Sequence, residues 1–224
     1  MENMEIQIAP SILSADFCNL ERDLERISNA DMVHVDVMDH HFVPNLTIGE
    51  PVVKRICEVT DLPVDVHLMI EDPDRWAPGY AELGAHSVTF HMGATHAPVR
   101  LARQLHSMGC EAWFAVRPAE PVEPIFDILE EFDTILIMAV EPGFGGQKFL
   151  SNQRGKVRRL RNEITRRGLK TNIQVDGGVS PKTAATVAEA GANILVAGSA
   201  VYGAEDPAKA INDIRDTAAA AYRD

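Results

Sequence analysis

Short runs rich in valine and isoleucine alternate with longer amphipathic segments along nearly the whole chain. Short apolar runs are typical of buried strands, and apolar positions three or four residues apart indicate helices with one apolar face. The expected strands are residues 6–12, 32–37, 63–69, 87–91, 111–116, 134–140, 172–176 and 193–197. The expected helices are residues 16–30, 50–59, 73–83, 96–108, 121–132, 152–167, 181–190 and 207–221.

This succession of strand–helix units predicts an α/β fold with a parallel sheet that helices cover. Eight units favour a closed (β/α)8 TIM barrel, and a length of 224 residues lies within the range of that fold. A doubly wound open sheet is the alternative architecture. No linker or low-complexity tract interrupts the pattern, so we expect a single domain over residues 1–224.

Histidines and aspartates stand at the carboxyl ends of three expected strands. His34 and Asp36 share one face of the second strand, because side chains alternate along a strand, and His67 and Asp176 end the third and seventh strands. The carboxyl ends of the strands form the mouth of a TIM barrel, where catalytic groups lie. Each residue taken singly is also typical of a hydrogen-bonded core position. Together, two imidazoles and two carboxylates suit a divalent Zn, Fe, Mn or Co ion.

Glycine-rich segments follow the last three expected strands. Glycine lets backbone N–H groups approach a ligand closely, and loops after the last strands of TIM barrels commonly bind phosphate. An ordinary tight loop is the alternative for each segment taken alone. The segments contain Gly143, Phe144, Gly145, Gly146, Gly177, Gly178, Gly198 and Ser199.

The composition of the chain limits its partners and its location. The 33 Asp and Glu residues outnumber the 21 Lys and Arg residues, which gives a net charge of −12. This charge disfavours binding to nucleic acid or to an anionic membrane, so the basic stretch at 156–161 is interpreted as a solvated face or a subunit contact. No apolar run approaches the ~20 residues of a membrane span. With no signal-peptide pattern and three scattered cysteines, we expect a cytoplasmic protein with reduced thiols.

Several motifs occur in one order from about residue 6 to the C-terminus. They are Ile8-Ala9-Pro10-Ser11-Ile12-Leu13-Ser14-Ala15-Asp16-Phe17, His34-Val35-Asp36-Val37-Met38-Asp39, Phe42-Val43-Pro44-Asn45, His67-Leu68-Met69, Glu141-Pro142-Gly143-Phe144-Gly145-Gly146-Gln147-Lys148-Phe149 and Val175-Asp176-Gly177-Gly178-Val179. In this combination the chain resembles the ribulose-phosphate 3-epimerase family. The resemblance implies a TIM barrel of the ribulose-phosphate-binding type, reversible interconversion of D-ribulose 5-phosphate and D-xylulose 5-phosphate, and a homo-oligomer.

The resemblance also implies roles for individual residues. Those matching His34, Asp36, His67 and Asp176 bind one divalent metal ion per subunit, and the two aspartates also act as acid and base. The substrate, a phosphorylated ketopentose, is expected to contact Ser11, His67, Gly143, Phe144, Gly145, Gly146, Gly177, Gly178, Gly198 and Ser199. An apolar wall beside it is expected from Met38, Met69 and Met138, which would otherwise be ordinary core residues.

The implied chemistry is physically coherent. A base and an acid on opposite sides of the substrate can remove the C3 proton and return it to the other face. A metal ion on the C2 and C3 oxygens would stabilise the enediolate that forms between these steps.

Four residues depart from the usual pattern of the family, namely His40, Glu50, Gly93 and Arg117. None belongs to the expected metal set, so they concern the pocket rim and the length of the substrate. A D-allulose 6-phosphate 3-epimerase with the same catalytic groups is the closest alternative. A non-catalytic sugar-phosphate-binding barrel is a second.

Two further reaction classes are disfavoured. A phosphate-barrel lyase of the hexulose-phosphate synthase kind would carry an Asp-x-Lys signature, where the third strand has Asp65-Val66-His67. A Schiff-base aldolase needs a lysine at a strand end, and no lysine ends an expected strand.

Overall fold

The computed structural model describes residues 5–222, so residues 1–4 and 223–224 of the expected domain lie outside the described part. The strands are β1 (Gln7–Pro10), β2 (Val33–Met38), β3 (Val64–Met69), β4 (Ser87–His91), β5 (Glu111–Val116), β6 (Thr134–Met138), β7 (Asn172–Asp176) and β8 (Ile194–Ala197). The α-helices are α1 (Leu20–Glu25), α2 (Glu50–Val59), α3 (Pro73–Glu82), α4 (Pro98–Ser107), α5 (Gln153–Arg167), α6 (Ala184–Glu189), α7 (Ser199–Tyr202) and α8 (Pro207–Ala221). The 3-10 helices are η1 (Ile12–Ser14) and η2 (Glu123–Glu131).

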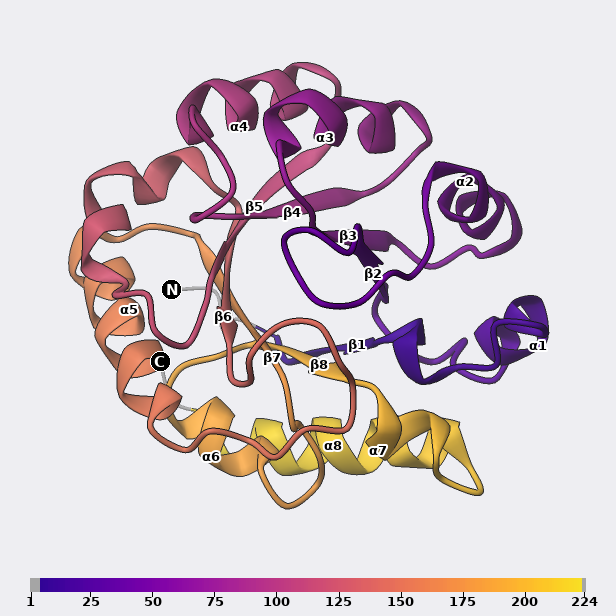
Figure 1. Ribbon diagram of the computed structural model, residues 1–224. Helices are drawn as coiled ribbons and strands as arrows, with labels where there is room; N and C mark the ends of the chain where they lie inside the picture. Colours follow the sequence, from indigo (N-terminus) through magenta and orange to yellow (C-terminus); the bar gives the residue numbers. More distant parts are fainter. Residues whose placement is uncertain (1–4, 223–224) are drawn as a thin grey trace.

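The strands form a parallel sheet in which neighbours follow the order of the chain from β2 to β8, with β1 beside β8. Within residues 5–222, the seam between β1 and β2 has one bridge, between Ser11 and His34 at the carboxyl end. Near the other end of the seam, the Asp31 carboxylate accepts a hydrogen bond from Ile8 N–H at 2.7 Å. The sheet is thus a nearly closed barrel with helices around it (Figure 1), which confirms the expected TIM barrel and excludes the open sheet.

Side chains alternate between two environments along each strand. Val35 of β2 and Val66 of β3 belong to the apolar layer between sheet and helices, and both are fully buried. The alternate residues of the two strands, such as Asp36 and His67, point into the barrel. The register pairs Asp36 with His67 and Met38 with Met69, so inward residues of neighbouring strands lie at similar heights. This register is what brings polar groups of separate strands together.

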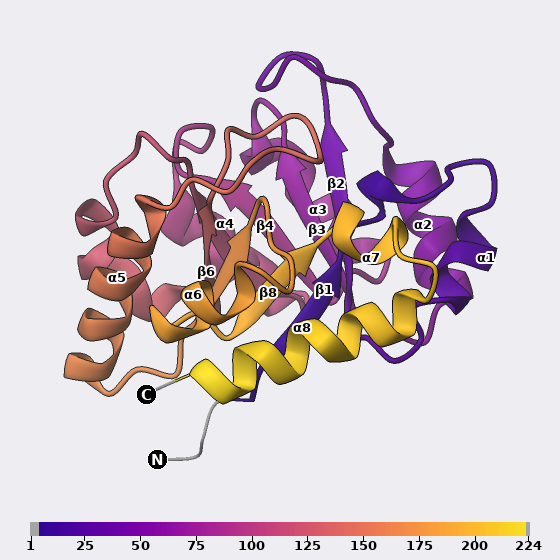
Figure 2. The same cartoon turned by 90° about the horizontal axis from the view of Figure 1, so that it is seen from below.

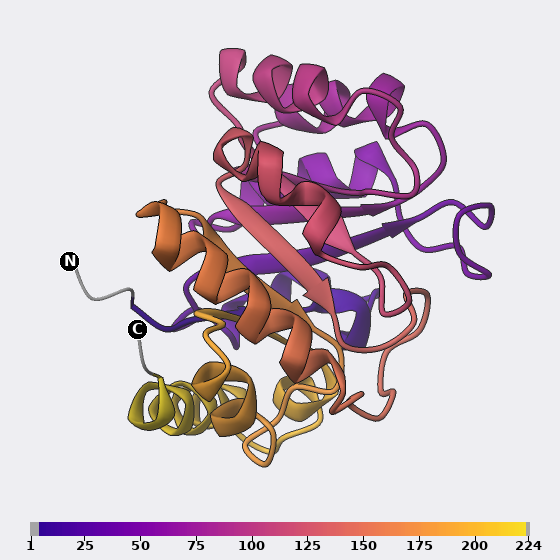
Figure 3. The ribbon, with the colours of Figure 1, turned by 90° about the vertical axis from the view of Figure 1, so that its left-hand side faces the viewer.

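The loops after β2, β6 and β7 lie at one end of the barrel, and the start of β1 lies at the opposite end (Figures 2 and 3). The amide of Asn45 donates a 2.8 Å hydrogen bond to the carbonyl oxygen of Gly143, which joins the loop after β2 to the loop after β6. These connected loops border the mouth of the barrel.

Three helical segments differ from the sequence-based expectation. The segment 121–132 contains a 3-10 helix rather than an α-helix, since its hydrogen bonds, such as that from Ile125 N–H to the carbonyl oxygen of Val122, span three residues. Helix α1 is much shorter than 16–30, because the Asp16 carboxylate accepts from Cys18 N–H and forms a turn there. The short helix α7 follows Gly198, where only a loop was expected.

Candidate active site

Four side chains converge inside the mouth of the barrel. They are His34 and Asp36 of β2, His67 of β3 and Asp176 of β7, and each offers one donor atom within 4.8 Å of the other three. His67 Nδ1 lies 3.2 Å from Asp36 Oδ1 and 3.9 Å from Asp176 Oδ2. His34 Nε2 lies 3.2 Å from His67 Nδ1. Two imidazole nitrogens and two carboxylate oxygens at this spacing fit a divalent transition-metal ion.

The two aspartates have different electrostatic surroundings. Burial alone would raise the pKa of Asp36, but the adjacent His34 and His67 outweigh it and lower that pKa below its usual range. Ser11 Oγ also donates to Asp36 Oδ2 at 2.6 Å. Burial, together with the negative charge of Asp36, raises the pKa of Asp176 to about 6. One carboxyl group therefore stays ionised under conditions where the other still carries a proton in part of the population.

His34 lies between two carboxylates. Its Nδ1 is 2.7 Å from Asp65 Oδ2 and its Nε2 is 3.3 Å from Asp36 Oδ1. Burial disfavours charge on this imidazole, but Asp36 and Asp65 outweigh burial and raise the pKa of His34 well above its usual value. The same negative surroundings favour a metal cation at this position.

A pocket of about 300 Å³ opens over these side chains. Both aspartates line it, as does every residue expected to contact substrate except His67. Those residues are Ser11, Met38, Met69, Met138, Gly143, Phe144, Gly145, Gly146, Gly177, Gly178, Gly198 and Ser199. His34 and His67 have no exposed surface and lie beneath the pocket. The lining also includes residues that the sequence analysis did not assign, namely Leu13, Ser14, Val140, Glu141, Pro142, Gln147, Val179, Ser180, Val196 and Ala200.

Two further buried polar side chains support the four converging residues and were not assigned from the sequence. Asp65 and His91 are both fully buried, and their polar atoms face His34 and His67 respectively. Asp65 precedes His67 by two residues on one strand, so alternation alone would have placed it on the inward face. His91 ends β4, a position that carries catalytic groups in TIM barrels.

Comparison with known proteins agrees with the resemblance seen in the sequence. The model of the ribulose-phosphate 3 epimerase family matches residues 7–202. The chain belongs to the ribulose-phosphate 3-epimerase family. A ribulose-phosphate 3-epimerase of Mycobacterium tuberculosis is 53% identical over 96% of this chain and 93% of its own length. The ribulose-phosphate 3-epimerase of Bacillus subtilis is 46% identical over 94% of this chain and 98% of its own length. The ribulose-phosphate 3-epimerases are isomerases, so the expected enzyme class is confirmed.

Solved structures of other enzymes share the fold of this epimerase family member. A 3-hexulose-6-phosphate synthase from Salmonella typhimurium has a TM-score of 0.70 at 19% identity, covering 97% of this chain and 100% of that one. KGPDC from Streptococcus mutans has a TM-score of 0.70 at 13% identity, covering 98% of this chain and 100% of that one. At such low identities the likeness concerns the barrel alone.

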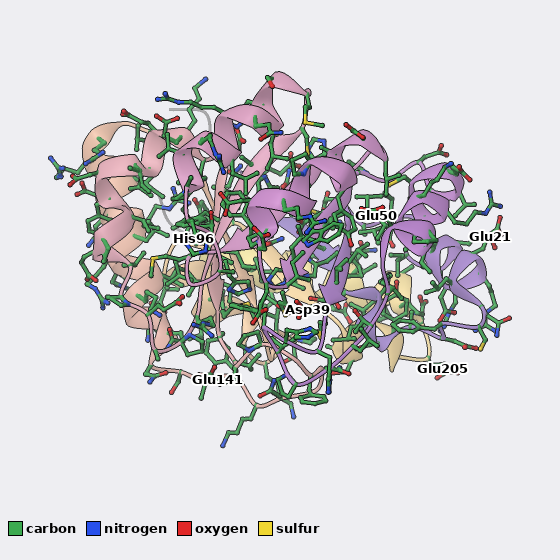
Figure 4. The ribbon with its side chains drawn as sticks, turned by 45° about the horizontal axis from the view of Figure 1, so that its top comes forward. Glu21, Asp39, Glu50, His96, Glu141 and Glu205 are labelled. Atoms are coloured by element: carbon green, nitrogen blue, oxygen red, sulfur yellow. The ribbon has the colours of Figure 1, made fainter. Side chains whose placement is uncertain are left out.

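The four residues that depart from the epimerase family pattern do not line the pocket. Gly93 and Arg117 lie next to each other, and a Cβ atom at residue 93 would lie only 2.8 Å from the Arg117 guanidinium. Glu50 lies at the start of α2, apart from Asp39 and Glu141 on the mouth loops (Figure 4). His40 has a left-handed backbone with φ of 61°. The departures thus affect the surroundings of the pocket rather than its lining.

Proposed function

We propose that this protein interconverts D-ribulose 5-phosphate and D-xylulose 5-phosphate by inverting C3. Family membership supports the class of reaction. The observation that carries the mechanism is that Asp36 and Asp176, on non-neighbouring strands, face one pocket with unequal proton affinities. Inversion at a carbon next to a ketone requires this kind of pair, since one group must accept a proton while the other supplies one.

Asp36 is the base and Asp176 the acid in one direction. Ionised Asp36 takes the proton from one face of C3, and the electrons of that C–H bond form the enediolate with the C2 carbonyl. Asp176 then gives its proton to the opposite face of C3, and the ketone is restored with C3 inverted. Asp36 ends protonated and Asp176 ionised, which is the starting state for the reverse direction.

We propose that His34, Asp36, His67 and Asp176 hold one divalent cation, which could be zinc, iron, manganese or cobalt. When bound, the cation supplies positive charge that polarises the ketone and offsets the charge of the enediolate. The described lining residues of the pocket include three carboxylates, of Asp36, Glu141 and Asp176, but no lysine or arginine. The described lining therefore has no lysine or arginine side chain that could offset the negative charge of the enediolate.

The glycine-rich segments of the pocket are proposed to hold the phosphate group. At Gly198, a Cβ atom would lie 2.7 Å from Ser14 Oγ, so a larger residue there would displace the Ser14 side chain between the loops after β1 and β8. Phosphate would then be held by backbone N–H groups and by hydroxyls such as that of Ser199. The buried Met38 and Met69 pack together beside Asp36 and would limit access of water to the enediolate.

We further propose that the enzyme acts in the cytoplasm as a homo-oligomer, without nucleic acid or membrane as a partner. This extends what the family resemblance implies. Among the described helices, none has the length and apolar character needed to cross a bilayer. Light scattering of the purified protein tests the assembly, because a mass equal to one chain would contradict it.

The decisive experiment is proton NMR of D-ribulose 5-phosphate with metal-replete protein in D₂O. We expect deuterium to replace the C3 proton while signals of D-xylulose 5-phosphate appear. Absence of both changes would overturn the proposed substrate. D-allulose 6-phosphate, assayed under the same conditions, tests the six-carbon alternative, which a higher kcat/KM on that substrate would favour.

Replacement of either catalytic aspartate by asparagine should abolish measurable epimerisation. Asp36→Asn and Asp176→Asn keep the size of the side chain but remove a proton-transfer group, which is worth about 10²–10⁴-fold in rate. The same NMR assay and a circular dichroism spectrum would show lost turnover in a folded protein. The exposed Asp213 of α8 offers a control, since Asp213→Asn should keep full activity. Activity within tenfold of wild type in either active-site variant would contradict the assignment.

A further inference from the structure

The two imidazoles of the site present different ring nitrogens to Asp36. His34 presents Nε2 at 3.3 Å from Asp36 Oδ1, whereas His67 presents Nδ1 at 3.2 Å from the same oxygen. An imidazole that binds a metal offers a lone pair on the metal side, so its hydrogen must lie on the other nitrogen. The partners of those other nitrogens therefore decide whether both lone pairs are available.

The partner of His34 is a carboxylate. Asp65 Oδ2 lies 2.7 Å from His34 Nδ1, and an ionised carboxylate only accepts hydrogen bonds. Asp65 is held in place by three further donors from neighbouring inward positions. These are Ser87 Oγ at 3.1 Å, Thr89 Oγ1 at 3.1 Å and Gln174 Nε2 at 2.9 Å. This arrangement places the hydrogen of neutral His34 on Nδ1 and leaves Nε2 as the lone pair.

The partner of His67 is a third imidazole. His91 Nε2 lies 2.9 Å from His67 Nε2, and their rings stack at 5.0 Å. Only one hydrogen fits between the two nitrogens, so one ring donates and the other accepts. His91 Nδ1 is buried and has no hydrogen-bond partner among the described residues. No contact on that side opposes the tautomer in which His91 Nε2 accepts.

The aromatic neighbours of His91 keep its ring in place. The ring of Phe42 lies 4.9 Å from that of His91, and the Arg117 guanidinium lies 4.9 Å from the Phe42 ring on which it packs. A neutral imidazole has one nitrogen that can accept, as His67 requires.

We propose that His91 is a positioning residue that fixes the tautomer and orientation of His67, and that Asp65 does the same for His34. With both partners in place, His34 Nε2 and His67 Nδ1 direct their lone pairs toward the same centre. The inference rests on the metal site proposed above and adds two residues that would not touch the metal or the substrate.

Paired substitutions at His91 separate this role from simple packing. His91→Phe keeps a flat ring between Phe42 and His67 but removes the acceptor, whereas His91→Gln provides an acceptor oxygen. We expect Co²⁺ to bind His91→Phe about 10–100-fold more weakly than wild type, as measured by competition with a chelator. His91→Gln should recover part of that affinity and a visible Co²⁺ spectrum closer to wild type. A matched control is Thr134→Val, which removes a buried hydroxyl that has no hydrogen-bond partner among the described residues. This variant should change neither the Co²⁺ affinity nor the visible Co²⁺ spectrum.

Long-range ¹H–¹⁵N spectra of zinc-loaded wild type test the tautomers without any substitution. We expect hydrogens on His34 Nδ1, His67 Nε2 and His91 Nδ1. A hydrogen on His91 Nε2, or unchanged Co²⁺ affinity in folded His91→Phe, would overturn the role of His91. A hydrogen on His34 Nε2 would overturn that of Asp65. If wild type binds neither Co²⁺ nor Zn²⁺, the proposed metal site itself fails, and this inference fails with it.

Discussion

At the scale of single residues, His40 stands in a backbone conformation that suits glycine better. Its φ of 61° lies in the left-handed region, which costs an L-residue about 1–2 kcal/mol. The turn is held nevertheless, because the Asp39 carboxylate accepts from the backbone N–H groups of His41 and Phe42 at 2.8 and 2.9 Å. The departure from the family pattern at this position therefore has a cost in stability that the neighbouring hydrogen bonds offset.

His40→Gly should stabilise the protein slightly. Release of about 1–2 kcal/mol of backbone strain is partly cancelled by the larger entropy of glycine in the unfolded chain, about 0.5–1 kcal/mol. We expect a net gain of about 0–1.5 kcal/mol in the free energy of unfolding, measured with urea. His40→Ala keeps the strained φ and serves as the control. A Gly variant less stable than the Ala variant would contradict this account.

The converging residues of the site could be predicted from the sequence, but the residues that support them could not. Alternation along β2 places His34 and Asp36 on one face regardless of the rest of the fold. The contact between His67 and His91 depends on how far β4 is shifted against β3, and a sequence pattern does not determine that shift. Asp65 was in an alternating run, yet its four hydrogen-bond partners come from three other strands.

At the scale of elements, the loop after β7 packs directly against the loop after β6. Gly178 has φ of 66°, and a Cβ atom there would lie 2.5 Å from the backbone nitrogen of Phe149. Gly177 is similarly restricted, since its Cβ atom would lie 2.5 Å from a side-chain atom of Val140. Both glycines line the pocket, so this close packing also shapes the proposed phosphate end.

A pair of alanine substitutions isolates the effect of that contact. Gly168 has the same φ of 66° but no atom within 4 Å of its Cβ position. Gly168→Ala should cost about 1 kcal/mol, for the backbone conformation alone. Gly178→Ala should cost a further 1–3 kcal/mol or so, with a raised KM for the phosphorylated substrate. Stability is measured by thermal unfolding. An equal loss in the two variants would show that the loops after β6 and β7 can move apart without an energetic cost.

Element types were largely predictable, whereas helix lengths and helix types were not. The strands follow valine- and isoleucine-rich runs that are buried on both sides, which is a strong local signal. The 3-10 helix η2 has a proline near its start, as the α-helices α2, α3, α4 and α8 do, so this signal does not distinguish the two helix types. Helix α7 begins at Ser199, directly after Gly198, and has only four residues, too few for an apolar period to be read from the sequence.

At the scale of the whole molecule, an acidic chain places three carboxylates close together inside its barrel. The chain carries a net charge of −12, and Asp36, Asp65 and Asp176 lie together within the barrel. A bound divalent cation would relieve the repulsion in the folded state and has no equivalent site in the unfolded chain.

Divalent metal should therefore raise the melting temperature of the protein. A ligand that binds only the folded state at 100 times its Kd adds about 2.7 kcal/mol, and each kcal/mol shifts the Tm of a chain of this size by roughly 2–4 °C. We expect an increase of roughly 5–10 °C with Mn²⁺ or Zn²⁺. The double variant Asp36→Asn with Asp176→Asn should lose most of this increase. An equal shift in that variant would place the ion elsewhere.

The seam between β1 and β2 makes the barrel and the site mechanically dependent on each other. β2 and β3 are joined through six register pairs, whereas the seam has the bridge between Ser11 and His34. Transient opening of the barrel thus costs least along this line. Ser11 also donates to Asp36, so each opening would separate a hydroxyl from the base and move an imidazole donor. Opening of the barrel along this seam would therefore also disturb the alignment of the reactive groups.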